Sequence, residues 1–189
     1  MLLDANVLYP ITECDFLLTA SSLQLIARPI VTELIIDEAM RNVRADRPDL
    51  DAGRIGKRFD AIRLVTDGHD DAPPARFADD SLINMKDRHI LAAALHHRVA
   101  VIITHDINLR AEIEHWRTRR GARAPRLVVQ SPNEFVTGLI AESPERVADV
   151  VIAMAARMRS PARSAADVAA ALTRRLPALA VIALELGAE

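Results

Sequence analysis

Four acidic residues follow or interrupt apolar segments at widely separated points of the chain. Asp4 follows an apolar start, Glu38 and Asp87 lie in segments with helical spacing, and Asp106 follows a second apolar run. Carboxylates brought together repel one another, and some would take up protons unless a cation balanced them. Mg²⁺ and Mn²⁺ favour oxygen ligands, and such a centre can hold a phosphodiester and activate a water. These four residues are therefore candidate metal ligands and catalytic residues.

Two predicted strands carry the first and last of these acids. Residues 1–4 are apolar up to Asp4, and residues 99–104, VAVIIT, are apolar up to Thr104 and show no polar alternation. Continuous β-branched runs are typical of parallel strands that are buried on both faces. Since the carboxyl ends of parallel strands share one edge of a sheet, Asp4 and Asp106 are expected there. Asp87, at the start of a helix, could approach that edge from the side.

Each of these three acids also has a structural interpretation. Asp4 and Asp106 could cap a turn or a helix. Asp87 could face the positive end of a helix dipole from the first turn. The catalytic interpretation therefore depends on all the acids occurring together in this order.

Glu38 lies in a helix that is predicted to begin after Thr32, a residue type suited to the N-cap. It falls on the same face as Leu34, one turn earlier, and that face is otherwise apolar. An acid on an apolar face needs a partner. The partner could be Arg41, Arg44 or a metal ion.

Helices that alternate with short apolar strands indicate an α/β layered fold. Further helices are predicted over residues 12–26 and 50–65, and a loop rich in Asp, Pro and Ala over residues 66–81. Strand signals cease toward the C-terminus. We therefore expect an α/β domain over residues 1–137, with a central parallel sheet sandwiched by helices, and a helical C-terminal extension over residues 138–189.

The extension contains an apolar helix face. Residues 147–158, VADVVIAMAARM, place Val and Met side chains at helical spacing. Such a stripe must be buried somewhere. It could cover the domain itself, or it could form a surface for a protein partner or a dimer mate.

Composition narrows the classes of protein. The formal net charge is −2, which gives no whole-chain nucleic-acid signal but does not exclude a local basic surface. The single cysteine, Cys14, excludes an intramolecular disulfide and is typical of a reduced, cytoplasmic protein. No basic region precedes the first apolar residues, and no apolar run reaches about 18 residues. Neither secretion nor membrane spanning is expected.

Five motifs in order resemble PIN-domain ribonucleases, in particular the VapC-type toxins of bacterial toxin–antitoxin pairs. Four motifs carry the acids: LLDANVLYP, TELIIDEAMRNV, DRHILAAAL and VIITHDINL. The fifth, VVQSPNEFV, is similar to the strand and helix that close the domain in one PIN subgroup. The resemblance covers about residues 1–137. It implies a PIN-like fold and a Mg²⁺- or Mn²⁺-dependent endoribonuclease.

The same resemblance implies partners and roles. Such toxins commonly form homodimers, are inhibited by a small VapB-like antitoxin, and cut structured RNAs such as tRNA or rRNA. In this chain Asp4, Asp87 and Asp106 would coordinate the metal directly or through water. Glu38 would bind it or orient the attacking water.

Three further residues would support the acids. Asn6 and Thr104 would hydrogen-bond the carboxylates or the water as outer-shell groups. Asn108 stands where many members of the family carry a second Asp, so coordination there would be weaker or mediated by water. Only three residues precede Asp4, fewer than is usual in the family.

A basic segment, WRTRRGARAPR, follows the fourth motif. Its arginines could bind RNA phosphates while Trp116 stacks on a base. Alternatively, the segment is a solvated helix end with Trp116 in the core. The candidate RNA-binding residues are Arg117, Arg119, Arg120 and Arg123.

Two other functions are alternatives to the nuclease. A haloacid-dehalogenase-like phosphatase also begins with a strand-end Asp, but it needs a general acid two residues later, where this chain has Asn6. A catalytically inactive PIN-like RNA-binding or scaffold protein is the second alternative. The four intact acids argue against it, whereas Asn108 leaves room for it.

Overall fold

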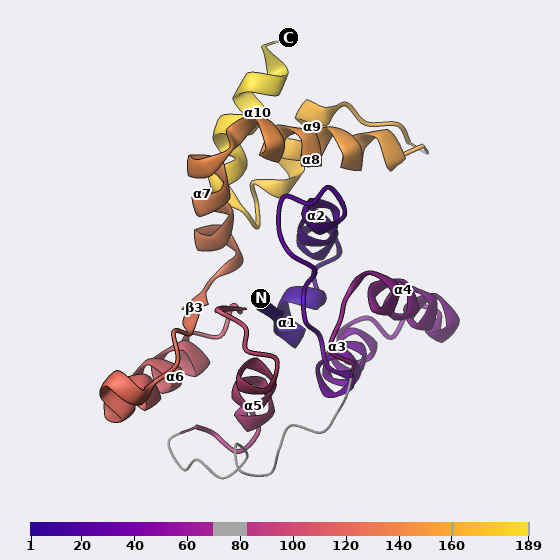
Figure 1. The fold of residues 1–189 in the computed structure, drawn as a ribbon. Helices are drawn as coiled ribbons and strands as arrows, with labels where there is room; N and C mark the ends of the chain where they lie inside the picture. The colour runs from indigo at the N-terminus through magenta and orange to yellow at the C-terminus, as the bar shows by residue number, and fades with distance from the viewer. Residues whose placement is uncertain (70–82, 160, 189) are drawn as a thin grey trace. The chain divides into compact units, whose positions relative to one another are not determined.

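The computed structural model describes residues 1–69, 83–159 and 161–188, and Figure 1 shows their fold. The residues form two compact units. The first holds Met1–Tyr9 and Arg28–Gln130, and the second holds Pro10–Ala27 and Ser131–Glu189. Most of the loop predicted over residues 66–81 lies outside the described residues.

The first unit is built on a three-stranded parallel sheet in the order β1-β2-β3. The strands are β1 (Leu2–Leu3), β2 (Val101–Ile103) and β3 (Val128–Gln130). Leu2 is paired with Ile102, which in turn is paired with Val129. The predicted α/β class and the parallel sheet are confirmed, although β1 and β2 are shorter than the segments predicted for them.

Single-residue bridges extend the parallel pairing beyond β1. Ile30 bridges both Leu2 and Asp67. Gly68, the next residue, has a positive φ of 79°, and a Cβ there would lie 2.6 Å from Cγ2 of Ile30. Only glycine accepts both that backbone conformation and that close approach. The sequence does not predict this pairing, because a single bridged residue has no periodicity.

Helices surround the sheet within the first unit. They are α1 (Ala5–Leu8), α3 (Glu33–Asp46), α4 (Ala52–Val65), α5 (Arg88–His96) and α6 (Ile107–Arg120), followed by the short 3₁₀ helix η2 (Gly121–Arg123). Thr32 caps α3 as predicted, since its side chain accepts from the Ile35 N–H. The expectation that Leu34 shares the buried face of α3 is wrong. Leu34 is 45% exposed, because the buried stripe runs through Ile35, Ile36 and Ala39.

The second unit is entirely helical in its described part. It contains α2 (Ile11–Ser22), α7 (Pro132–Glu142), α8 (Pro144–Arg157), α9 (Ala165–Leu172), the 3₁₀ helix η3 (Pro177–Leu179) and α10 (Ala180–Gly187). Capping boxes start two of these helices, with Ser131 and Glu134 on α7 and Ser164 and Asp167 on α9. Such boxes satisfy backbone donors that the first turn of a helix leaves unpaired.

The apolar face of α8 is covered within this second unit. Its buried side chains include Val147, Val150 and Met154. Helix α8 contacts both α2 and α9. The stripe noted in the sequence therefore has its cover without a further partner.

The division of the chain differs from the predicted one. The predicted boundary at residue 137 falls inside α7, whereas the contact boundary lies before Ser131. Helix α2 groups with the C-terminal helices although it lies early in the chain. The assignment of residues 1–137 to a nuclease domain stays a prediction.

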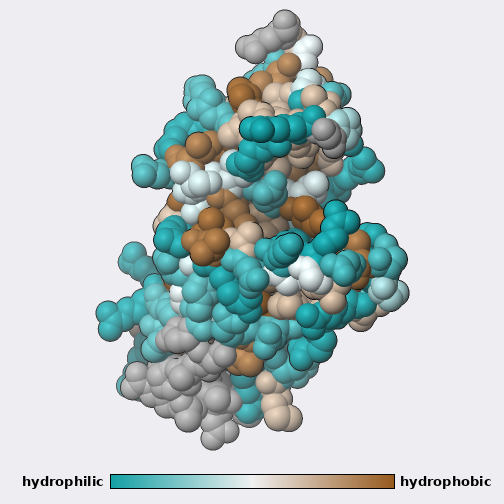
Figure 2. Space-filling view, turned by 90° about the vertical axis from the view of Figure 1, so that its right-hand side faces the viewer, coloured by the Kyte–Doolittle hydropathy of each residue, from teal (hydrophilic) through white to brown (hydrophobic). Residues whose placement is uncertain are grey.

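The surface carries scattered hydrophobic residues. On the face drawn in Figure 2 they form separate patches among hydrophilic ones. Met85, Ile107 and Leu184 are among the most exposed of them. Within the described ranges, no helix combines the length and the apolarity needed to cross a membrane.

Candidate active site

Asp4 is held by three hydrogen bonds at the end of β1. Its Oδ1 accepts from the backbone N–H of Ala5 at 2.6 Å, which caps α1. Its Oδ2 accepts from Thr104 Oγ1 at 2.6 Å and from Asn6 Nδ2 at 2.7 Å. Asp4 is only 6% exposed, and burial raises the pKa of its carboxyl despite the hydrogen bonds from Thr104 and Ala5. The residue is both a helix cap and a buried, partly desolvated acid.

Thr104 connects Asp4 to Asp106. It follows β2, beside the end of β1, and its Oγ1 accepts from the Asp106 backbone N–H at 2.9 Å. Asp106 in turn caps α6, because its Oδ1 accepts from the backbone N–H groups of Asn108 at 2.8 Å and Leu109 at 3.1 Å. The two strand-end acids therefore belong to one polar network at the carboxyl edge of the sheet.

Asn6 completes this network. Its Nδ2 also donates to Thr104 Oγ1 at 3.0 Å, and its Oδ1 accepts from the His105 N–H at 3.0 Å. Each polar atom of its side chain thus has a partner. These bonds fix the rotamer of Asp4 and hold one of its oxygens.

All four predicted acids line a single pocket with a volume of about 380 Å³. The described residues that line it are Asp4, Asn6, Leu34, Glu38, Arg41, Lys86, Asp87, His89 and Asp106. These residues come from the segments that follow β1 and β2, including α1, from α3 and from the start of α5. The fold thus gathers side chains that lie as far apart as positions 4 and 106.

Asp87 occupies the N-cap position of α5, yet its side chain makes no capping hydrogen bond. The pKa of its carboxyl is raised, chiefly by burial, with further contributions from the charges of Asp106, Glu112 and Asp4. The positive charge of Lys86 acts in the opposite direction. A carboxylate that does not cap its helix and is crowded by other acids is suited to hold a cation.

Glu38 lies beside a histidine rather than one of the predicted arginines. The His89 Nε2 is 3.6 Å from Glu38 Oε2, and this buried atom has no hydrogen bond to any residue that the structure describes. His89 was missed, because nothing in the spacing between α3 and α5 predicts the contact. Its place two residues after Asp87 was the available signal.

Two cations on the pocket wall were not predicted as site residues, although Arg41 was named as a possible partner of Glu38. Arg41 and Lys86 line the pocket, and both are exposed. Neither forms an ion pair with any residue that the structure describes. Arg41 follows Glu38 by three residues on α3, and Lys86 directly precedes Asp87, so proximity to the acidic motifs could have identified both.

Asn108 is not brought into the pocket. Its side chain is exposed, and its recorded contact with Asp106 is made by the backbone N–H. The expected outer-shell role of the Asn108 side chain therefore has no contact to support it. Any residue with a backbone N–H would make the same bond.

The predicted arginine cluster lies away from this pocket, at the end of α6 and in η2. Arg117 is bound to Glu114 at 2.8 Å, and the guanidinium of Arg120 lies 4.6 Å from the ring centre of Trp116. Trp116 is 2% exposed, so it belongs to the core and is not available to stack on a base. Arg119 and Arg123 are exposed, and their contact with RNA stays a prediction.

The acids are not arranged as a ready-made metal cage. Among residues 1–69, 83–159 and 161–188, no group of three or more His, Cys, Asp or Glu side chains is placed to hold a metal ion. The pocket nevertheless presents an all-carboxylate oxygen donor set from four positions. Such donors match the chemistry of Mg²⁺ and Mn²⁺, which usually retain several waters.

Comparison with known proteins gives one family. Residues 132–183 match the family model described as the VapC50 C-terminal domain. The match covers well under half of the chain and lies in the second unit, outside the acidic motifs. It suggests a VapC-family toxin. No curated protein and no solved structure matches the chain significantly.

Proposed function

We propose that the protein is a metal-dependent endoribonuclease with a PIN-like first unit, acting as the toxin of a toxin–antitoxin pair. The observation that carries this proposal is the convergence of Asp4, Glu38, Asp87 and Asp106 on one pocket. A structural role for each acid alone would not require the four to meet. The match of residues 132–183 to the VapC50 C-terminal domain supports the same family from the other unit.

The donor set fits a divalent cation. Asp4 and Asp87 have raised pKa values because burial disfavours their charge, and nearby acids add to the effect. A cation would relieve this repulsion, and Asp4, Glu38, Asp87 and Asp106 would hold it, in part through water. A bound Mg²⁺ or Mn²⁺ supplies the positive charge that activates a water and stabilises the leaving oxygen of a phosphodiester.

The chain's own residues would position the substrate. Thr104 and Asn6 keep Asp4 in one rotamer through hydrogen bonds of 2.6 and 2.7 Å. Arg41 and Lys86, on the wall of the same pocket, would hold the phosphates on either side of the bond to be cut. Without such cations, four carboxylates would repel a polyanionic substrate.

The partners follow from the family rather than from a contact. We propose a VapB-like antitoxin as inhibitor, a homodimer as the assembly, and tRNA or rRNA as the class of target. The match to a VapC domain supports the antitoxin partner.

One observation favours a second candidate, a catalytically inactive PIN-like RNA-binding protein. Within the described part of the chain, no three acids or histidines form a metal-holding group. The phosphatase alternative is weaker, because it needs a general acid two residues after Asp4, and this chain has Asn6 there. The side-chain amide of Asn6 donates a hydrogen bond to Asp4 Oδ2. An amide cannot release a proton to a leaving group.

The deciding experiment is cleavage of total cellular RNA by the purified full chain. The reactions contain EDTA, Mg²⁺ or Mn²⁺, and the variants are Asp4→Asn and Asp106→Asn. Fragments that need the metal and disappear in both variants would establish the nuclease, and their ends would identify the target. Equal trace cleavage by wild type and variants would leave the RNA-binding alternative.

A further inference from the structure

The end of α8, α9 and the turn that follows α9 are basic although the whole chain is not. Residues 157–175 contain five arginines and one aspartate, a formal charge of +4, whereas the chain carries −2. Arg157 is used inside the unit, where it donates to Thr19 Oγ1 at 2.6 Å and lies 3.7 Å from Asp15. The other four arginines are exposed, namely Arg159, Arg163, Arg174 and Arg175.

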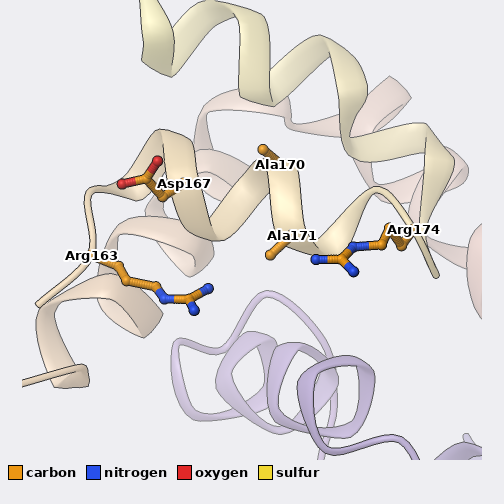
Figure 3. Close-up of a pocket in the computed structure, with 5 residues that line it drawn as sticks. All are labelled: Arg163, Asp167, Ala170, Ala171 and Arg174. Atoms are coloured by element: carbon orange, nitrogen blue, oxygen red, sulfur yellow. The ribbon is translucent and has the colours of Figure 1, made fainter. Parts of the chain in front are cut away.

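A hollow of about 330 Å³ lies along one face of α9 and its flanking turns (Figure 3). Its lining residues follow the spacing i, i+4, i+7, i+8 and i+11, which places them on one helix face. They are Arg163, Asp167, Ala170, Ala171 and Arg174. The two alanines are too short to fill the space. In Figure 3 the side chains of Arg163 and Arg174 extend toward Ala171 from opposite sides.

Among the described lining residues the one acid, Asp167, is hydrogen-bonded at the start of the helix. Asp167 accepts from the Ser164 hydroxyl at 2.8 Å and from the Ser164 N–H at 3.3 Å. The hydrogen bond from the Ser164 side chain is also the main reason that the pKa of Asp167 is lowered. Arg163 and Arg174 form no ion pair with residues 1–69, 83–159 or 161–188. The charge of Arg163 also contributes to the lowered pKa of Asp167, so the hollow presents two guanidinium groups and one carboxylate, a formal charge of +1.

We propose that this α9 hollow binds phosphate groups of an RNA backbone. Guanidinium groups are the preferred partners of phosphate, and backbone contacts need no particular base sequence. A protein partner is disfavoured, because protein interfaces centre on aromatic or large apolar side chains, and this lining has none. The site is separate from the acidic pocket, and the inference does not require cleavage there.

The test measures binding rather than cleavage. A fluorescently labelled single-stranded RNA is titrated with full-length Asp4→Asn protein in EDTA, between 50 and 300 mM salt. Loss of two phosphate contacts in Arg163→Ala/Arg174→Ala should weaken binding several-fold and reduce the salt slope by about 1.4, at about 0.7 per phosphate. The matched control is Arg159→Ala/Arg175→Ala, which removes the same charge nearby but spares the lining. It should lose clearly less affinity.

Three outcomes would overturn the proposal. Equal losses of RNA affinity in the two double variants would show that RNA binding depends only on the general basic charge of this region and not on the hollow. Equally tight, arginine-dependent binding of polyglutamate would indicate an acidic protein partner instead. Competition by inorganic phosphate or pyrophosphate, together with RNA affinity that is unchanged by the lining variant, would indicate a small-anion site. As a folding control, the variants should keep the melting temperature of the wild type. The conservative variant Arg163→Lys/Arg174→Lys keeps both charges and should restore most of the salt slope.

Discussion

The acidic pocket of the first unit and the α9 hollow of the second unit are assembled in opposite ways. The pocket draws its acids from positions between 4 and 106, which the sheet and two helices bring together. The hollow draws both arginines from residues 163 to 174, along one helix face. Where distant segments meet in the pocket, the carboxyl groups of Asp4 and Asp87 are partly buried. Burial raises their pKa values. A single helix face leaves its charges in solvent. Perturbed acids are typical of catalytic sites, whereas solvated arginines suit binding.

Neutralising one acid of the pocket should give the largest effect. Asp106→Asn preserves the cap of α6, because Asn caps helices as well as Asp does, but it removes the negative charge. We expect cleavage to fall roughly 100-fold or more, since charge stabilisation worth several kcal/mol is lost. Single-turnover RNA cleavage measures this, with thermal melting as the control for folding. Wild-type cleavage by the variant would reduce Asp106 to a helix cap.

Mg²⁺ should stabilise the protein through the acidic pocket. At about 100 times its Kd, a ligand that binds only the folded state contributes about 2.7 kcal/mol. Thermal melts with Mg²⁺ and with EDTA should therefore differ for the wild type and coincide for Asp4→Asn. Arg163→Ala, in the other unit, should keep the full difference. A shift that survives in Asp4→Asn would place the cation elsewhere.

Removing a cation from the acidic pocket should weaken substrate binding. Arg41→Ala should raise KM roughly tenfold, the effect expected when a charged hydrogen bond is lost, and should leave kcat nearly unchanged. Arg44→Ala is the matched control, because Arg44 lies on the same helix but does not line the pocket. Steady-state kinetics on a defined RNA separates KM from kcat. Equal effects of the two variants would contradict a specific role for Arg41.

Removing a helix cap in the second unit should lower the stability of the protein and leave the cleavage rate unchanged. Ser164→Ala removes the capping box of α9 and should lower the free energy of unfolding by about 1 kcal/mol. Urea denaturation followed by circular dichroism measures the loss. The cleavage rate should stay at the wild-type value, because the acids belong to the other unit. A matching fall in cleavage would show that the two regions are coupled.

The smallest effect concerns pH, where the two regions should differ in sign. Raised pKa values at Asp4 and Asp87 mean that the folded state holds these protons more tightly than the unfolded state. Their contribution to stability is therefore present below about pH 3.8 and is lost as the pH rises through the folded pKa. The lowered pKa of Asp167 contributes stability above its ordinary value, which is lost on acidification. Urea unfolding in EDTA from pH 3 to 7 should be flatter for Asp87→Asn, whereas Asp167→Asn should remove stability only at the higher pH.

Local signals in the sequence predicted much of the secondary structure. Thr32 marked the start of α3, because a cap involves only a few consecutive residues. The apolar run of residues 99–104 likewise predicted a buried parallel strand, because such a run is a pattern of consecutive residues. Its pairing partners and its true length of three residues came only from the neighbouring strands.

Other features depended on contacts between distant segments. The position of His89 beside Glu38 and the burial of Trp116 are decided by packing that no local periodicity contains. The grouping of α2 with the C-terminal helices has the same origin, since its partner α8 lies more than a hundred residues later.

The sequence by itself determined which acids were candidates, because Asp4, Glu38, Asp87 and Asp106 stand out against apolar surroundings. Only the tertiary structure decided that they share a pocket, and that Arg41 shares it with them. The physical reason is the range of the interactions. Caps, periodicity and charge runs are complete within a few residues, whereas a pocket is defined by where separate elements cross.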